Sequence, residues 1–179
     1  MTGSEPGRVV VGVCRSLGGY QALRYAVAQA RERGATLVAV RAYSASAPRE
    51  MWWRSALAES AASEVAAAFT DALGGMPRDV IIRVAVSEGL PGPVLVGSAD
   101  RADDLLVIGG SGSHRLTRAW SAAVARYCAR HAQCPVLIAP VPAMARAGGA
   151  GRLARAVAFA AEESLHSSDR SEPTSGQRP

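Results

Sequence analysis

The chain has 179 residues, of which 49 % are hydrophobic and 20 % are charged, and its formal net charge is +5 at pH 7. This length allows one well-filled domain but not two of ordinary size, and the hydrophobic content excludes a wholly disordered chain. No apolar run approaches the roughly 20 residues that a membrane span needs, and residues 1–8 lack the features of a secretory signal. We therefore expect a cytoplasmic protein with no membrane partner.

The basic residues are all arginines, because the sequence contains no lysine. This absence excludes the Walker A, Schiff-base and kinase-type lysines on which several enzyme classes depend. The arginines are interleaved with acidic residues rather than gathered in a block, so we expect a solvated surface and no nucleic-acid partner. Three cysteines are an odd number, which favours reduced thiols over a disulfide framework.

The first elements form a repeating unit. Residues 8–14, a short Val-rich run, are typical of a buried strand in a parallel sheet. Residues 20–33 have apolar side chains at helical spacing, and Gly34 is expected to end this helix. Residues 36–43 return to a strand pattern. The pattern predicts a strand–helix–strand unit.

The same alternation continues to about residue 140. A helix over about 50–73 ends at Gly74 and Gly75, and the last helix has Leu116, Trp120, Val124 and Tyr127 at the spacing of a buried face. Strands alternating with helices predict an α/β fold with a five-stranded, parallel, doubly wound sheet and helices on both faces. The remaining elements are strands at about 79–86, 104–108 and 134–140, and helices at about 91–101 and 116–131.

The composition changes after residue 142. We therefore expect one domain over 8–142, followed by an appendage over 143–179. The appendage begins with a glycine hinge, contains one predicted helix at about 152–164, and ends in a Ser-, Pro- and Gly-rich tail that we expect to be disordered.

A glycine-rich turn follows the strand at 104–108 and precedes the last helix. Its sequence, Gly109-Gly110-Ser111-Gly112-Ser113, stands where free backbone N–H groups and a helix dipole can hold a phosphate. Ligands of doubly wound sheets bind at the carboxyl ends of the strands near the point where the strand order reverses. We expect Cys14 and Gly109 to lie at that point.

The order of elements and the residues around them resemble the universal stress protein family over about 8–140. The resemblance rests on VVVGVCRSLGGYQALRYAVAQARERGATLVAV, on ADDLLVIGGSG and on HAQCPVLIAP, whose His131, Ala132, Cys134 and Pro135 match the family's H-A-x-C-P signature. It implies a Rossmann-like sheet, of the adenine nucleotide alpha hydrolase type, in the order 3-2-1-4-5. It also implies a homodimer formed through the final strand, here 134–140.

The resemblance extends only partly to the nucleotide site. Family members that bind ATP have an Asp after the first strand and the motif G-x2-G-x9-G-[ST] after the fourth. Here Cys14 replaces the Asp, and Ala122 and Ala123 stand at the second half of the motif. Each lost polar contact costs on the order of 1–2 kcal/mol, so we expect no bound cofactor, with ATP as the alternative. The candidate nucleotide-binding residues are Cys14, Ala42, Gly109, Gly112, Arg115, Ala122 and Ala123.

These observations favour a non-catalytic stress-response protein that acts through contacts with a protein partner. One alternative is a regulator that binds ATP or another adenine nucleotide, with Arg115 clamping a phosphate. Another is a redox-responsive protein acting through Cys14, whose thiol faces a predicted helix N-terminus.

Two further chemistries are not expected. A hydrolase triad at Ser111 would find its acid and base only in the appendage, so we expect no enzyme. Cys128, His131 and Cys134 lack a fourth ligand, so we expect no metal site.

Overall fold

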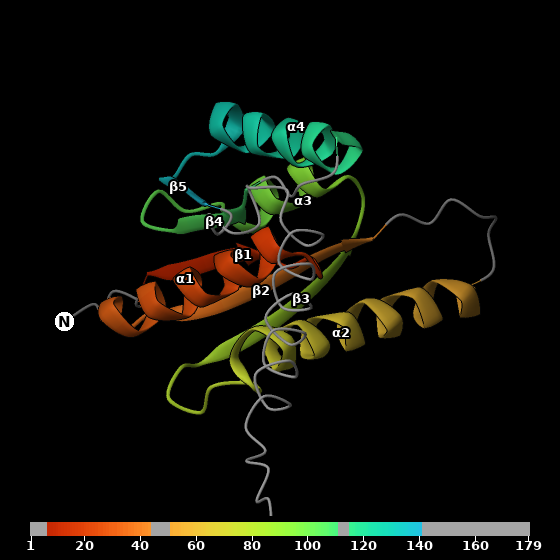
Figure 1. Ribbon diagram of the computed structural model, residues 1–179, viewed down its shortest axis with the longest axis horizontal. Coiled ribbons are helices and arrows are strands. Elements are labelled where there is room, and N and C mark those ends of the chain that lie inside the picture. The colour runs from red at the N-terminus through yellow and green to blue at the C-terminus, as the bar shows by residue number, and fades with distance from the viewer. Residues whose placement is uncertain (1–6, 44–50, 111–114, 141–179) are drawn as a thin grey trace, which may run out of the picture. The chain divides into compact units, whose positions relative to one another are not determined.

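The computed structural model describes residues 7–43, 51–110 and 115–140 (Figure 1). The predicted appendage at 143–179, with its hinge, helix and tail, lies outside these residues. In the described part of the chain, no helix is both long enough and apolar enough to cross a membrane.

Five parallel strands form one sheet in the order β3-β2-β1-β4-β5, which confirms the predicted fold class and strand order. β1 is the central strand, with Arg8 opposite Thr36 of β2 and Val9 opposite Leu105 of β4. The strand order reverses between β1 and β4, so the crevice for a ligand is expected at their carboxyl ends. The strands are β1 (Arg8–Gly12), β2 (Thr36–Tyr43), β3 (Ile82–Glu88), β4 (Leu105–Gly109) and β5 (Val136–Ala139).

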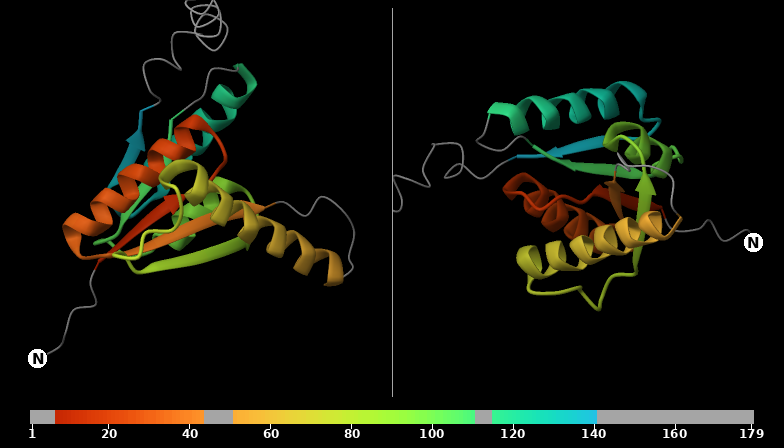
Figure 2. Two further views of the ribbon diagram at one scale, coloured as in Figure 1. Left: turned by 60° about the horizontal axis from the view of Figure 1, so that its bottom comes forward. Right: turned by 90° about the vertical axis from the view of Figure 1, so that its right-hand side faces the viewer.

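Four helices cover the two faces of the sheet: α1 (Leu17–Arg33), α2 (Met51–Leu73), α3 (Pro91–Ser98) and α4 (Arg115–His131). α1 and α2 lie on one face, and α3 and α4 lie on the other (Figures 1 and 2). The alternation along β1 explains the two layers, because Val9 and Val11 pack in one buried cluster and Val10 packs in the other. Both faces of β1 are therefore buried, as its apolar sequence predicts.

The ends of α1 follow from its capping residues. The Ser16 hydroxyl accepts a hydrogen bond from the backbone N–H of Gly19 at 3.0 Å, and Gly34 ends the helix in the left-handed conformation with φ of 59°. The predicted stop at Gly34 is confirmed. The predicted start at residue 20 is late, because Gly18 and Gly19 resemble turn residues although they lie in the first turn of the helix.

The predicted buried face of α4 needs a correction. Tyr127 is 37 % exposed, whereas its neighbour Cys128 is completely buried in the cluster beneath α3 and α4. Val124 is partly buried against the same cluster, so the buried face runs from Val124 to Cys128 rather than to Tyr127. The side chains of Leu116 and Trp120 lie outside the described part.

At the amino end of the sheet, a buried ion pair joins β1 to β4. Asp104 is only 1 % exposed, and its carboxylate accepts hydrogen bonds from Arg8 Nε at 3.0 Å, Arg8 Nη2 at 2.6 Å and the Arg101 backbone N–H at 3.1 Å. A buried carboxylate needs this kind of pairing to offset its desolvation. Arg8 also contacts Asp100 at 2.5 Å and thereby lowers the pKa of that carboxyl group.

At the carboxyl end, backbones approach one another without intervening side chains. A Cβ atom at Gly18 would lie 2.1 Å from the carbonyl oxygen of Gly110, and one at Gly19 would lie 2.1 Å from that of Cys14. A Cβ atom at Gly109 would lie 2.6 Å from the backbone of Gly18. The first turn of α1 therefore rests directly on the ends of β1 and β4, and only glycine fits at these positions.

We predict that Gly18→Ala lowers the free energy of unfolding by about 1–3 kcal/mol, because the added methyl group displaces packed backbone. The matched control is Gly97→Ala in α3, where a Cβ atom would meet no heavy atom within 4 Å. Its expected effect is neutral or stabilising, since alanine is the better helix former. Urea denaturation measures both variants, and equal shifts in the two would contradict the close contact.

Candidate functional site

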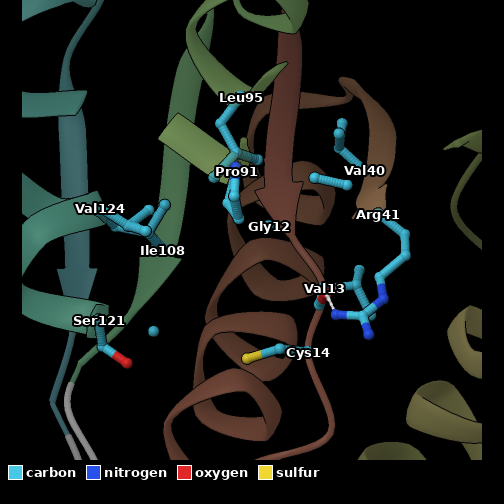
Figure 3. A pocket seen from close by; sticks show the side chains of 12 residues that line it. Gly12, Val13, Cys14, Val40, Arg41, Pro91, Leu95, Ile108, Ser121 and Val124 are labelled. Carbon is cyan, nitrogen blue, oxygen red and sulfur yellow. Dashed lines mark hydrogen bonds between the residues drawn. The ribbon is translucent and has the colours of Figure 1, made fainter. Parts of the chain in front are cut away.

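A pocket of about 140 Å³ lies at the carboxyl ends of β1, β2 and β4 (Figure 3). Its walls come from consecutive residues at the strand ends. Two residues of α3, Pro91 and Leu95, and two of α4, Ser121 and Val124, complete it. This is the position at which doubly wound sheets bind ligands. The contributions of the strands are Gly12, Val13 and Cys14 at β1, Val40, Arg41 and Ala42 at β2, and Ile108 and Gly109 at β4.

The pocket brings together three of the seven candidate residues, Cys14, Ala42 and Gly109. They come from three different strands, so the sheet topology alone places them side by side. Gly112 lies outside the described residues. Arg115 is the first residue of α4, and its side chain is also outside the described part. The nucleotide-binding role of all seven residues stays a prediction.

Ala122 and Ala123 do not join this group. α4 begins at Arg115, so both alanines lie about two turns inside the helix. Backbone N–H groups at such depth are used within the helix and are not free to hold a phosphate. Ala123 lines a different pocket, between α3 and α4, and Ala122 is among the lining residues of neither. The helix predicted over about 116–131 already included both alanines, whereas the motif spacing assigned them to the nucleotide site.

Cys14 is exposed at the end of β1, and its Sγ lies 3.2 Å from the Ser16 hydroxyl that caps α1. The thiol is therefore next to the N-terminus of a helix, as predicted. The other two cysteines are buried. Burial raises the pKa of the Cys128 thiol to about 11 and also raises that of Cys134, so neither is a thiolate at neutral pH.

Arg41 is a site residue that our sequence analysis missed. Its guanidinium donates a hydrogen bond to the carbonyl oxygen of Val13 at 3.3 Å and pairs with Glu64 of α2. The side chain lies on the opposite side of β1 from Ser121 and Val124 (Figure 3), so its charge is directed away from them. The signal was present in the sequence, because a single arginine interrupts the apolar strand TLVAVRAY.

The described lining of the pocket limits its chemistry. It includes no Asp, Glu or His, and apart from Arg41 its polar side chains are the thiol of Cys14 and the hydroxyl of Ser121. The volume is close to that of a cavity of roughly 150 Å³ that holds benzene, so the pocket suits a planar ring rather than a whole nucleotide. Any phosphates would extend beyond it.

No metal centre is found in the part of the chain that the structure describes, where no three or more His, Cys, Asp or Glu side chains are grouped to hold an ion. His131 stacks on Tyr127 instead, with ring centroids 4.3 Å apart. Cys134 lies below α3, 4.0 Å from the carbonyl oxygen of Ala99. His131 and Cys134 of the signature therefore pack against different neighbours.

Similar solved structures share this fold. UspA from Lactobacillus plantarum is 22 % identical with a TM-score of 0.55, over 76 % of this chain and 99 % of that one. A universal stress protein from Archaeoglobus fulgidus is 21 % identical with a TM-score of 0.54, over 74 % and 97 %. A universal stress protein in complex with cAMP is 27 % identical with a TM-score of 0.50, over 78 % and 100 %.

No curated protein matches the chain significantly in sequence. The sequence pattern of the Universal stress protein family, in contrast, matches residues 6–140, which is most of the chain and all nine helices and strands described above. The chain therefore belongs to the universal stress protein family.

Proposed function

We propose that the chain is a non-catalytic stress-response protein with a degenerate nucleotide site, acting through contacts with a protein partner. The observation that carries the proposal is the position of Ala122 and Ala123 inside α4. Their methyl groups offer no hydrogen bond, and their backbone N–H groups are used within the helix. Cys14 further reduces the number of polar contacts to a nucleotide, because a neutral thiol is a poorer hydrogen-bond acceptor than a carboxylate.

The absence of a general base among the described lining residues supports a role without turnover. Proton abstraction from an attacking water needs a group such as a carboxylate or an imidazole within hydrogen-bond reach. The described pocket wall provides neither. Signalling by occupancy or by surface contacts is therefore the better match to this site than hydrolysis.

The second candidate function is regulation by a bound adenine nucleotide. The 27 % identical universal stress protein in complex with cAMP favours it, and so does the pocket that joins Cys14, Ala42 and Gly109. A ring bound there would place its substituents near the glycine-rich turn. The two candidates differ in whether the wild-type chain binds nucleotide at all, which is directly measurable.

We predict that freshly purified protein releases no adenine nucleotide on denaturation and that apo protein shows no heat of binding with ATP at micromolar concentrations. The double variant Ala122→Gly/Ala123→Ser is expected to bind ATP at least tenfold more tightly. Glycine weakens the helix interior and serine is a good N-cap, so the helix can begin later and free its N–H groups. Micromolar binding by the wild type would instead establish the nucleotide-regulated function.

A redox role for Cys14 is the third candidate, favoured by the exposure of this thiol beside the start of α1. We predict that a thiol reagent at neutral pH labels one cysteine rapidly in the native protein and all three after unfolding. The Cys14→Ser variant is expected to lose the rapid phase, because Cys128 and Cys134 are buried. Slow native labelling would argue against redox sensing through this residue.

We also propose a homodimer that pairs the β5 strands. β5 is at the edge of the sheet, and Ile138 on this strand is 49 % exposed. Edge strands present unpaired backbone groups and are natural sites of pairing with a second chain. A second copy would cover both the backbone edge and this apolar side chain.

Light scattering coupled to size-exclusion chromatography tests the dimer. We predict a mass of two 18.5 kDa chains for the wild type and one for Ile138→Glu, because a charge is costly to bury at the interface. Ile81→Glu is the matched control, since Ile81 is 69 % exposed and precedes the opposite edge strand, β3. A dimer that persists in Ile138→Glu would exclude this interface.

A further inference from the structure

A second pocket, of about 220 Å³, lies between the start of α3 and the middle of α4. Leu90, Pro91 and Pro93 form one wall, and Ala123, Val124 and Tyr127 form the other. The phenol of Tyr127 is the one polar group among the side chains of this described lining. The described lining contains no charged side chain.

The start of α3 is unusually poor in hydrogen-bond donors. A helix normally presents free backbone N–H groups in its first turn, which attract anions. Here Pro91 and Pro93 have no N–H, and the N–H of Val94 donates to the carbonyl oxygen of Leu90 at 3.2 Å. Of the first three residues of α3, Gly92 alone has a backbone N–H, so the wall offers few donors to a phosphate or carboxylate.

Large apolar side chains stand exposed at this pocket. Leu90 is 62 % exposed and Tyr127 is 37 % exposed. The position of Tyr127 is fixed from two sides, by its stacking on His131 and by Gly92, where a Cβ atom would lie 2.8 Å from the Tyr127 ring. A hydrophobic molecule in the pocket would remove these surfaces from water without rearranging the helices.

The pocket is adjacent to the one at the strand ends but is distinct from it. Pro91 and Val124 line both, so this pair of side chains forms the partition between them. Ala123 lines only the pocket between α3 and α4. A substitution at Ala123 can therefore alter one pocket while leaving the lining of the other intact.

We propose that the pocket between α3 and α4 binds an uncharged aromatic small molecule of about two fused rings. The volume exceeds the roughly 150 Å³ that holds a single benzene ring. The lack of charged side chains in the described lining and the shortage of helix N–H donors select against anions, and the apolar walls favour a planar hydrocarbon surface. This binding is independent of nucleotide at the strand ends.

Two fluorescent probes test the proposal on the full chain. N-phenyl-1-naphthylamine is neutral, and 8-anilinonaphthalene-1-sulfonate has the same ring system with a sulfonate added. We expect saturable binding of one neutral probe per chain, with a Kd at least tenfold below that of the sulfonate. The formal net charge of +5 would favour the sulfonate at any non-specific surface, so tighter sulfonate binding overturns the proposal.

Variants locate the probe. Ala123→Leu fills the pocket and is expected to weaken binding of the neutral probe at least tenfold, whereas Ala129→Leu, at an exposed position of the same helix, is expected to change it less than twofold. Leu90→Asp provides an independent test, because Leu90 is the N-cap of α3 and aspartate is a favourable cap that keeps the helix folded. It should also weaken binding at least tenfold.

Three further results would overturn the proposal. The first is no saturable fluorescence increase with the neutral probe. The second is a Kd that stays within twofold of the wild type in both Ala123→Leu and Leu90→Asp. The third is a loss of probe binding as protein concentration rises, which would mean that a second copy of the chain covers the pocket.

Discussion

The direct contact between the first turn of α1 and the ends of β1 and β4 is the constraint on which the candidate site depends. Three glycines, Gly18, Gly19 and Gly109, allow backbone to meet backbone at distances that no side chain permits. This contact fixes the loop after β1, so that Cys14 emerges beside the Ser16 cap and into the wall of the pocket.

This contact changes what the glycine-rich turn means. A glycine at position 109 is required by the packing of α1, whether or not a phosphate ever lies above it. The first half of the nucleotide motif therefore has a structural reason of its own in this chain. The second half has none, and there alanines occupy the interior of α4. The packing of α1 therefore explains the glycine in the first half of the nucleotide motif, while the polar groups expected in the second half are missing.

The sequence allowed the sheet to be predicted almost completely, because the central strands are apolar on both faces and helical segments alternate with them along the chain. The strand order came from the resemblance rather than from periodicity. The predictions that were wrong concern properties that depend on three-dimensional contacts. The early start of α1 depends on close backbone packing, and the outward position of Tyr127 depends on how α4 meets α3. Ser16 is a local signal for the start of α1, but the two glycines in the first turn resemble turn residues, and the position of Tyr127 has no local signal.

The site was predictable only in part for the same reason. Cys14, Ala42 and Gly109 could be predicted from their positions at strand ends, because the sheet topology brings these ends together. The separation of Ala122 and Ala123 from that group follows from the start of α4 at Arg115, which agrees within one residue with the helix predicted over about 116–131 but is not apparent from the motif spacing. Arg41 was visible as a charge in an apolar strand, but its partners, the Val13 carbonyl and Glu64, are distant in sequence.

The amino end of the sheet contributes to stability, whereas the carboxyl end forms the candidate binding site. At the amino end, Asp104 is buried and every contact of its carboxylate with Arg8 and Arg101 is a good hydrogen bond. At the carboxyl end, Nε of Arg41 is buried without a partner among the described groups, and Cys14 is exposed. An unsatisfied donor costs stability that a fully paired group would retain. The carboxyl end, which carries this cost in stability, is also the end where doubly wound sheets bind their ligands. The fully hydrogen-bonded ion pair at the amino end holds β1 and β4 together.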